Sequence, residues 1–156
     1  MSTQPELLAV HAVNLTIDIA IDADVASTWK AMIEDVGQWW RADFCICKGS
    51  TMAMDARVGG MMYEKLPDGA GFAWGNLISF QPNKHLAYVT YVIPPWAGPA
   101  QSVVQIALAE NPDGSTLLTL TDSLIGHLTE EHLASTKDGW RLLYGEGGLK
   151  SFIESS

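Results

Sequence analysis

Residues 115–125 read STLLTLTDSLI, and the regular alternation in this stretch decides the class of fold. Leucines alternate with serine and threonine, so apolar and polar side chains fall on opposite faces of an extended chain. The apolar face carries Leu118, Leu120, Asp122 and Leu124. The pattern predicts a half-buried strand with one carboxylate, that of Asp122, on its apolar face.

The same two-residue period occurs in several further stretches of the chain. We expect strands at 11–21, 51–58, 60–66, 71–81, 85–93 and 101–110. In the stretch 71–81, the inward face is expected to carry Phe72, Trp74, Ile78 and Phe80. Turn signals such as Gly59-Gly60 and Asn111-Pro112-Asp113-Gly114 separate the strands. Strands joined by short turns pair antiparallel, and each clear strand has one apolar face that must be covered.

Apolar residues at helical spacing predict the elements that cover this sheet. We expect helices over 25–34, 37–40 and 138–154. Asp22 or Asp24 is placed to cap the first helix, and Asp138 the last. Only the last helix is long enough to cover the sheet. The expected fold class is therefore α+β, a curved antiparallel sheet wrapped around a long C-terminal helix with a cavity between them.

Glycines interrupt the pattern of this last helix at Gly145, Gly147 and Gly148. Each costs about 1 kcal/mol relative to alanine in a helix interior. Close packing of the backbone, a kink, or room for a guest molecule would each explain them.

Length and composition bound the class of protein. The 156 residues fit a single domain over 1–156, with its core at about 11–154. Nine basic and eighteen acidic side chains give a net charge of −9, which argues against nucleic acid and anionic membranes as partners. No apolar run approaches the ~20 residues of a membrane span, and the N-terminus has no signal-peptide pattern. We therefore expect a soluble, cytoplasmic protein.

Short motifs along the chain point to a family. They are Ile21-Asp22-Ala23, Trp39-Trp40, Asp55-Ala56-Arg57-Val58-Gly59-Gly60, Gly75-Asn76-Leu77-Ile78-Ser79-Phe80-Gln81-Pro82, Ser115-Thr116-Leu117-Leu118-Thr119-Leu120-Thr121 and Gly139-Trp140. In this order the chain resembles the START-like superfamily, also called SRPBCC or polyketide cyclase. It is most similar to the AHSA-like branch, named for homology to the activator of the heat-shock-protein-ninety ATPase. The resemblance covers about 11–154 and implies the helix-grip (Bet v-like) fold, which hosts binders, carriers and enzymes.

Aromatic residues are the candidate lining of the cavity, because their rings contact apolar ligands while tyrosine and tryptophan also offer a polar atom. The candidates are Trp40, Tyr63, Trp74, Tyr88, Trp140 and Tyr144. Ordinary core packing is the alternative for each ring. Asp122 is a candidate acid, base or ligand anchor, because an unpaired inward carboxylate has a raised pKa. Alternatively, its strand bulges to turn it outward, or it pairs with His127 or Arg141.

No metal site or cofactor is expected. Cys45 and Cys47 form a C-x-C pair without the further ligands that structural zinc requires, so two reduced thiols are the simpler interpretation. The histidines His11, His85, His127 and His132 show no metal-ligand spacing. The glycines at 145–148 follow no strand and are not a phosphate loop.

Three functions are compatible with the expected fold and its cavity. The first is a module that binds a small hydrophobic or amphipathic molecule, for which burial of ~300 Å² of apolar ligand surface gives ~7 kcal/mol before association costs. The second is a cyclase, dehydratase or hydrolase that uses Asp122 with Tyr63 or Tyr88. The third, suggested by the family name alone, is a chaperone-associated interaction domain. Trp96, in a proline-rich loop over 94–99, is a candidate pocket lid or homodimer contact.

Overall fold

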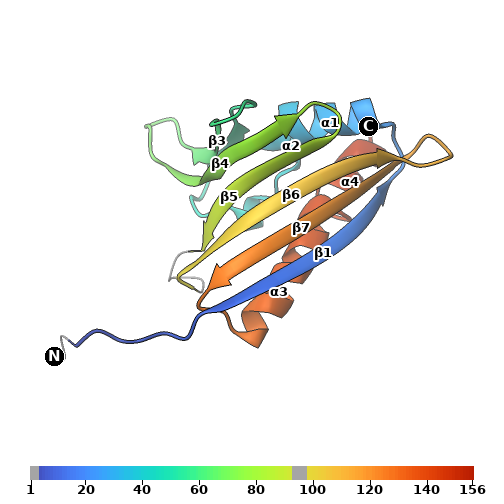
Figure 1. The fold of residues 1–156 in the computed structure, drawn as a ribbon. Coiled ribbons are helices and arrows are strands. Elements are labelled where there is room, and N and C mark those ends of the chain that lie inside the picture. The colour runs from blue at the N-terminus through green and yellow to red at the C-terminus, as the bar shows by residue number, and fades with distance from the viewer. Residues whose placement is uncertain (1–3, 93–97) are drawn as a thin grey trace.

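The computed structural model describes residues 4–92 and 98–156, and these contain a seven-stranded antiparallel sheet (Figure 1). The order across the sheet is β1-β7-β6-β5-β4-β3-β2. The strands are β1 (His11–Ile21), β2 (Thr51–Met54), β3 (Met61–Lys65), β4 (Gly71–Gln81), β5 (His85–Val92), β6 (Ala100–Glu110) and β7 (Thr116–Gly126). The predicted antiparallel α+β fold is confirmed, although β2 is shorter than the predicted 51–58. Trp96 lies outside the described residues.

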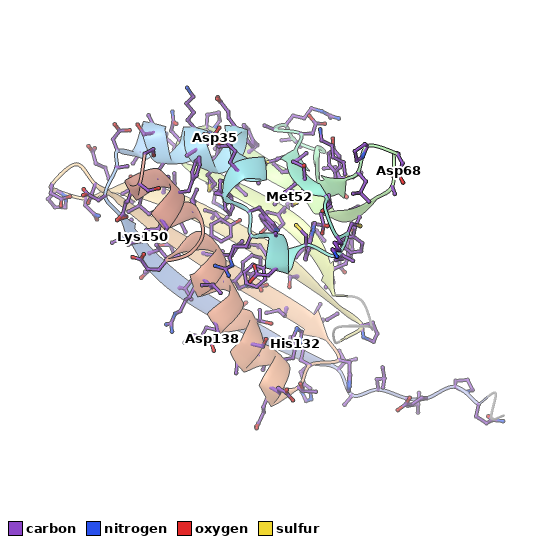
Figure 2. All side chains as sticks on the ribbon, turned by 180° about the vertical axis from the view of Figure 1, so that it is seen from behind. Asp35, Met52, Asp68, His132, Asp138 and Lys150 are labelled. Atoms are coloured by element: carbon purple, nitrogen blue, oxygen red, sulfur yellow. The ribbon has the colours of Figure 1, made fainter. Side chains whose placement is uncertain are left out.

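The helices lie on one face of this curved sheet, as the reverse view shows (Figure 2). They are α1 (Val25–Glu34), α2 (Val36–Trp39), the 3-10 turn η1 (Ala42–Phe44), α3 (Glu130–Tyr144) and α4 (Leu149–Glu154). Asp24, one of the two predicted caps, accepts a hydrogen bond from the backbone N–H of Ser27 at 2.7 Å. This bond satisfies a donor that the first turn of α1 would otherwise leave unpaired.

The C-terminal helix differs from the single helix predicted over 138–154. α3 begins eight residues earlier, at Glu130, because the Thr129 hydroxyl caps it by accepting from the backbone N–H of His132 at 3.1 Å. A break then separates α3 from α4. A Cβ atom at Gly145 would lie 2.3 Å from the carbonyl oxygen of Arg141, and one at Gly148 would lie 1.8 Å from that of Leu143. Close backbone packing at a sharp bend therefore accounts for these two glycines.

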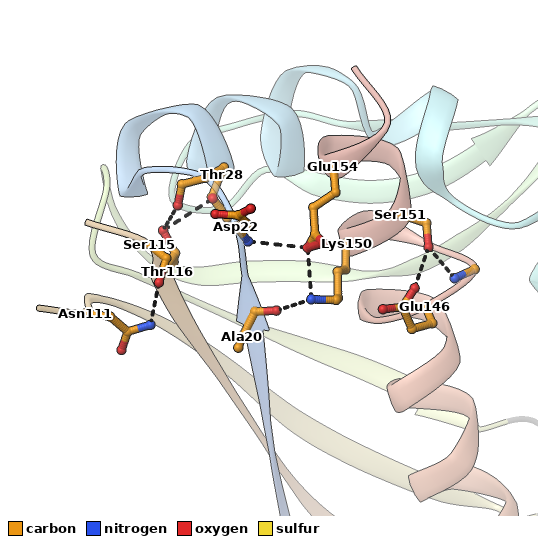
Figure 3. Close-up of polar contacts among 12 residues, drawn as sticks. Ala20, Asp22, Thr28, Asn111, Ser115, Thr116, Glu146, Lys150, Ser151 and Glu154 are labelled. Atoms are coloured by element: carbon orange, nitrogen blue, oxygen red, sulfur yellow. Dashed lines mark hydrogen bonds and ion pairs between the residues drawn. The ribbon is translucent and has the colours of Figure 1, made fainter. Parts of the chain in front are cut away.

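Polar contacts attach α4 to the end of β1 (Figure 3). The Lys150 ammonium donates to the carbonyl oxygen of Ala20 at 2.6 Å and lies 2.9 Å from the Glu154 carboxylate. Glu154 in turn accepts from the backbone N–H of Asp22 at 3.3 Å. Because α4 follows the break directly, these contacts help to hold the C-terminal end of α3 over the sheet.

One prediction of side-chain direction in β4 is wrong. Ile78 was expected to face inward, but 52% of its surface is exposed. The pairing of β4 with β3 skips Trp74, which shifts the alternation by one position, and a second skip opposite β5 at Ile78 restores it before Phe80. Leu77, which is 1% exposed, takes the inward position instead.

The core lies between the sheet and the helices. Its largest contributions come from the inner faces of β1, β6 and β7 and from α1 and α2. Core residues include Ile17, Ile19, Ile21, Trp29, Met32, Ile106, Leu118 and Leu120. No helix in the described part of the chain is long and apolar enough to cross a membrane.

Candidate functional site

A pocket of about 290 Å³ lies beside this core, and we call it the sheet–helix pocket. It lies between the inner face of the central strands, the stretch around α2 and η1, and α3. Its lining residues are Trp40, Phe44, Met62, Trp74, Tyr88, Thr90, Tyr91, Ser102, Asp122, Leu124, His132, Ser135, Thr136, Gly139, Trp140 and Leu143. The volume is at the lower end of the range of about 300–1,000 Å³ typical of small-molecule sites.

The sheet wall of the pocket is formed where the inner face changes from apolar to polar. Thr90 of β5 pairs directly with Ser102 of β6, and Val104 of β6 pairs with Asp122 of β7. Thr90, Ser102 and Asp122 are all buried. All three point to the inner face because each lies an even number of positions from the buried apolar residues of its own strand.

The opposite wall is a single stripe of α3. His132, Ser135, Thr136, Gly139, Trp140 and Leu143 recur at intervals of three and four residues, which places them on one face of a helix. Figure 2 shows His132 near the start of α3 and Asp138 further along the same helix. Four of these positions carry small or polar residues.

Asp122 points inward, as its position in the strand predicts, and is 1% exposed. The Trp140 indole N–H donates to its Oδ2 atom at 2.7 Å, while Oδ1 has no hydrogen-bond partner in the described chain. The alternatives of an outward bulge or an ion pair with His127 or Arg141 are therefore wrong. Burial raises the pKa of Asp122, and the Trp140 hydrogen bond, the Ser102 hydroxyl and His132 only partly oppose that shift.

Buried polar side-chain atoms without a partner are concentrated in the sheet–helix pocket. Among the described residues there are four, and all belong to lining residues: Trp40 Nε1, Tyr88 Oη, Asp122 Oδ1 and His132 Nδ1. The Tyr88 hydroxyl is close enough to Tyr144 for each to influence the other, and burial is the main reason that the pKa of each phenol is raised. Unpaired buried polar groups cost free energy, so such a concentration needs an explanation.

The predicted aromatic residues divide into two groups. Trp40, Trp74, Tyr88 and Trp140 line the pocket, and the Trp40 and Trp74 rings pack with centroids 5.8 Å apart. Tyr144 is buried behind this lining, where its ring packs against those of Trp39 and Trp140.

Tyr63 takes a different position from the one expected. It pairs with Ala53 and Ala73, and it alternates with the buried Met62 and Glu64 of β3. Its side chain therefore lies on the other face of the sheet and does not line the pocket.

A second buried carboxylate, that of Glu64, was not singled out from the sequence. Its oxygens accept hydrogen bonds from the backbone N–H groups of Ile46 and Cys47, the Ser50 hydroxyl and the Trp74 indole, at 2.7–2.9 Å. Burial alone raises the pKa of Glu64, but these hydrogen bonds outweigh it and lower the pKa below its ordinary value. Glu64 thus fixes both the 46–50 segment and the pocket-lining Trp74. The inward parity that identified Asp122 also applies to Glu64, between Met62 and Leu66.

The cysteines contribute no cross-link. Cys45 and Cys47 are free thiols of intermediate burial, and burial raises the pKa of Cys45. Within 4–92 and 98–156, no three histidine, cysteine, aspartate or glutamate side chains gather in a way that could hold a metal ion.

A curved antiparallel sheet closed by a C-terminal helix is the helix-grip architecture of the START-like superfamily. Residues 22–154 match the family model described as activator of Hsp90 ATPase homolog 1-like protein, and the chain belongs to this family. None of the curated proteins compared with the chain matches it.

Solved structures share the fold at low sequence identity. A protein from Rhizobium leguminosarum is 19% identical with a TM-score of 0.74, over 97% of this chain and all (100%) of that one. CalU16 from Micromonospora echinospora is 21% identical with a TM-score of 0.64, over 96% of this chain and 84% of that one. DynU16, a protein of the dynemicin biosynthetic locus, is 20% identical with a TM-score of 0.65, over 90% of this chain and 47% of that one.

Proposed function

We propose that this protein binds a small amphipathic molecule in the sheet–helix pocket. The observation that carries the proposal is that all four unpartnered buried polar atoms of the described residues line this one pocket. In a fully packed interior, such atoms would be paired or replaced by apolar groups. A ligand whose polar atoms meet them, and whose apolar body contacts the aromatic rings, supplies the missing partners.

Gly139 supports the proposal independently. It lies on the pocket-facing stripe in the middle of α3, where glycine costs about 1 kcal/mol relative to alanine. A Cβ atom built there has no neighbouring heavy atom within 4 Å, beyond its own helix backbone and adjacent residues. No close contact therefore requires glycine at this position. The open space beside Gly139 is what a guest molecule in the pocket would need.

The structural neighbours are consistent with a small-molecule ligand. DynU16 comes from a biosynthetic locus, that of dynemicin. Because DynU16 is only 20% identical to this chain, the likeness supports a small-molecule ligand through the shared fold alone. The chemistry of the ligand must be inferred from the residues that line the pocket.

Titration with the neutral fluorescent probe N-phenyl-1-naphthylamine tests the proposal. The lining tryptophans Trp40, Trp74 and Trp140 lie close enough to transfer excitation energy to a probe in the pocket. We expect saturable enhancement of probe fluorescence with an affinity in the micromolar range, which corresponds to about 8 kcal/mol. A crystal structure of the complex should place the probe between β5–β7 and α3. No saturable binding of this probe or of a panel of hydrophobic metabolites would count against the proposal.

Catalysis in the same pocket is the second candidate. It is favoured by one observation, the free Oδ1 atom of Asp122, whose carboxyl has a raised pKa and faces the same space as the Tyr88 hydroxyl. A carboxyl of this kind serves as a general acid or base. Once a reaction is found, Asp122→Asn should abolish turnover while the protein stays folded and still binds the probe. Unchanged turnover in that variant would exclude this role.

A further inference from the structure

The charges on the wall of the sheet–helix pocket are one-sided. Asp122 is the only acidic lining residue, and the described lining contains no lysine or arginine. Arg41, which follows the lining residue Trp40, pairs with Asp43 at 2.8 Å and donates to the carbonyl oxygen of Gly147 at 3.1 Å. Its positive charge is thus paired with Asp43, and the guanidinium lies 5.7 Å from the centroid of the Phe44 ring. Among the described lining residues, His132 is the one side chain that can carry positive charge.

We propose that the sheet–helix pocket selects amphipathic molecules that bear a protonated amine, with Asp122 as the counter-ion, and that it discriminates against carboxylates. This inference rests on the proposed binding function and names the chemical class of its ligand.

The Asp122 carboxylate has one coordination direction left for a cation. Trp140 occupies Oδ2, whereas Oδ1 is buried and unpartnered. An ammonium group is a compact donor of hydrogen bonds with a full positive charge, and its pairing with a carboxylate away from water is among the strong hydrogen bonds in proteins. It would supply the partner that Oδ1 lacks and offset the cost of burying the charged carboxylate.

The rest of the lining suits a cation as well. The aromatic rings of Trp40, Trp74, Tyr88 and Trp140 share the same pocket wall as Asp122. The faces of such rings attract ammonium groups by about 0.5–2 kcal/mol each, and tryptophan does so most strongly. The net charge of −9 over the whole chain also favours the approach of a cation.

A carboxylate ligand meets the opposite conditions. It would bring a second negative charge beside Asp122 with no lysine or arginine in the described lining to balance it. Like charges brought together out of water cost several kcal/mol. Fatty acids and other amphipathic acids are therefore expected to bind weakly.

Four probes on one skeleton separate these possibilities: 2-naphthylmethylamine, 2-naphthalenemethanol, 2-naphthoate and naphthalene, titrated by calorimetry at neutral pH. We expect the amine to bind at least about tenfold more tightly than the alcohol, and the carboxylate to bind most weakly. Asp122→Asn keeps an acceptor for Trp140 but removes the charge. It should bring the affinities for the amine and the alcohol within about threefold of each other.

Glu110→Gln is the matched control, because it removes one negative charge from an exposed residue at the far end of β6. It should retain the preference for the amine. Equal binding of amine and alcohol, or tighter binding of the carboxylate, by the wild-type protein would overturn the ligand class while leaving the binding function intact. Retention of the amine preference in Asp122→Asn would overturn the role of Asp122. If none of the four probes binds to protein that does bind N-phenyl-1-naphthylamine, the inference fails and the proposed function stands; if N-phenyl-1-naphthylamine does not bind either, both fail.

Discussion

Substitution of Gly139 by alanine is expected to make the protein more stable. The position lies in the interior of α3, where alanine is favoured over glycine by about 1 kcal/mol. The added methyl group meets no heavy atom within 4 Å outside its own helix backbone and adjacent residues, so no steric cost offsets that gain. For a domain of 156 residues, a gain of 1 kcal/mol raises the melting temperature by about 2–4 °C.

A larger side chain at the same position should block the pocket. In Gly139→Leu the isobutyl group extends from the pocket-facing stripe of α3 into the sheet–helix pocket. Affinity for N-phenyl-1-naphthylamine should fall by at least about tenfold, while the melting temperature stays at or above that of the wild-type protein. A loss of binding without a loss of stability distinguishes a blocked pocket from a damaged fold.

Ala134→Leu provides the control, since Ala134 lies on the exposed side of the same helix. It adds a similar apolar surface to α3 but should leave probe affinity within about twofold of wild type. Differential scanning calorimetry and fluorescence titration of all three variants complete the experiment. A lower melting temperature for Gly139→Ala, or wild-type probe binding by Gly139→Leu, would refute the view that this glycine leaves room for a ligand.

Three further substitutions test the surroundings of the pocket. Glu64→Gln leaves two of the four donors around this side chain without an acceptor and should destabilise folding by about 3 kcal/mol in urea titrations. Because folding lowers the pKa of Glu64, its stabilisation is present above the unfolded pKa and is lost as pH falls through the folded pKa. A constant difference between variant and wild type across that range would contradict this role. The pH dependence expected for Asp122 is opposite to that of Glu64. Folding raises the pKa of Asp122, so ionisation of its carboxyl lowers the stability of the fold as pH rises through the raised pKa. Asp122→Asn should therefore be more stable than wild type at neutral pH and lose this advantage in acid; thermal melts at both pH values check the sign. Gly75→Ala places a Cβ atom 1.7 Å from the carbonyl oxygen of Val89 and should cost about 3 kcal/mol, whereas a wild-type melting temperature would show that β4 and β5 can separate there.

The sheet was predictable from the sequence because the alternation of apolar and polar residues in each strand indicates which face is buried. The alternation of Leu118, Leu120, Asp122 and Leu124 describes β7 correctly, including the inward carboxylate. Alternation does not determine which residues of neighbouring strands lie opposite each other. The pairing of Thr90 with Ser102, which forms the polar wall beside Asp122, therefore required the structure.

Irregularities within a strand were also hidden. The alternation of β4 is shifted twice, at Trp74 opposite β3 and at Ile78 opposite β5, so Leu77 lies inward while Phe80 again packs against the core as simple alternation predicts. Nothing in the residue types marks either position. Glu64 shows a different limit. The alternation in its strand indicated that Glu64 faces inward. Its partners Ile46, Cys47 and Ser50, however, belong to an irregular segment whose position cannot be predicted from a periodic pattern.

The start of α3 was missed for a reason that bears on function. A helix is recognised in a sequence by the apolar stripe that it buries, but the first turns of α3 line the sheet–helix pocket with His132, Ser135 and Thr136, none of which is fully buried. A stripe facing a packed core would carry leucine or isoleucine at these positions, and the prediction would then have begun near Glu130. Predictions of secondary structure from sequence patterns fail most often at positions where a residue serves function rather than stability. Gly139 and the unpaired atoms of His132 and Asp122 surround one pocket, on the same part of α3 that lacks an apolar stripe. The proposed ligand in that pocket would account for all three features together.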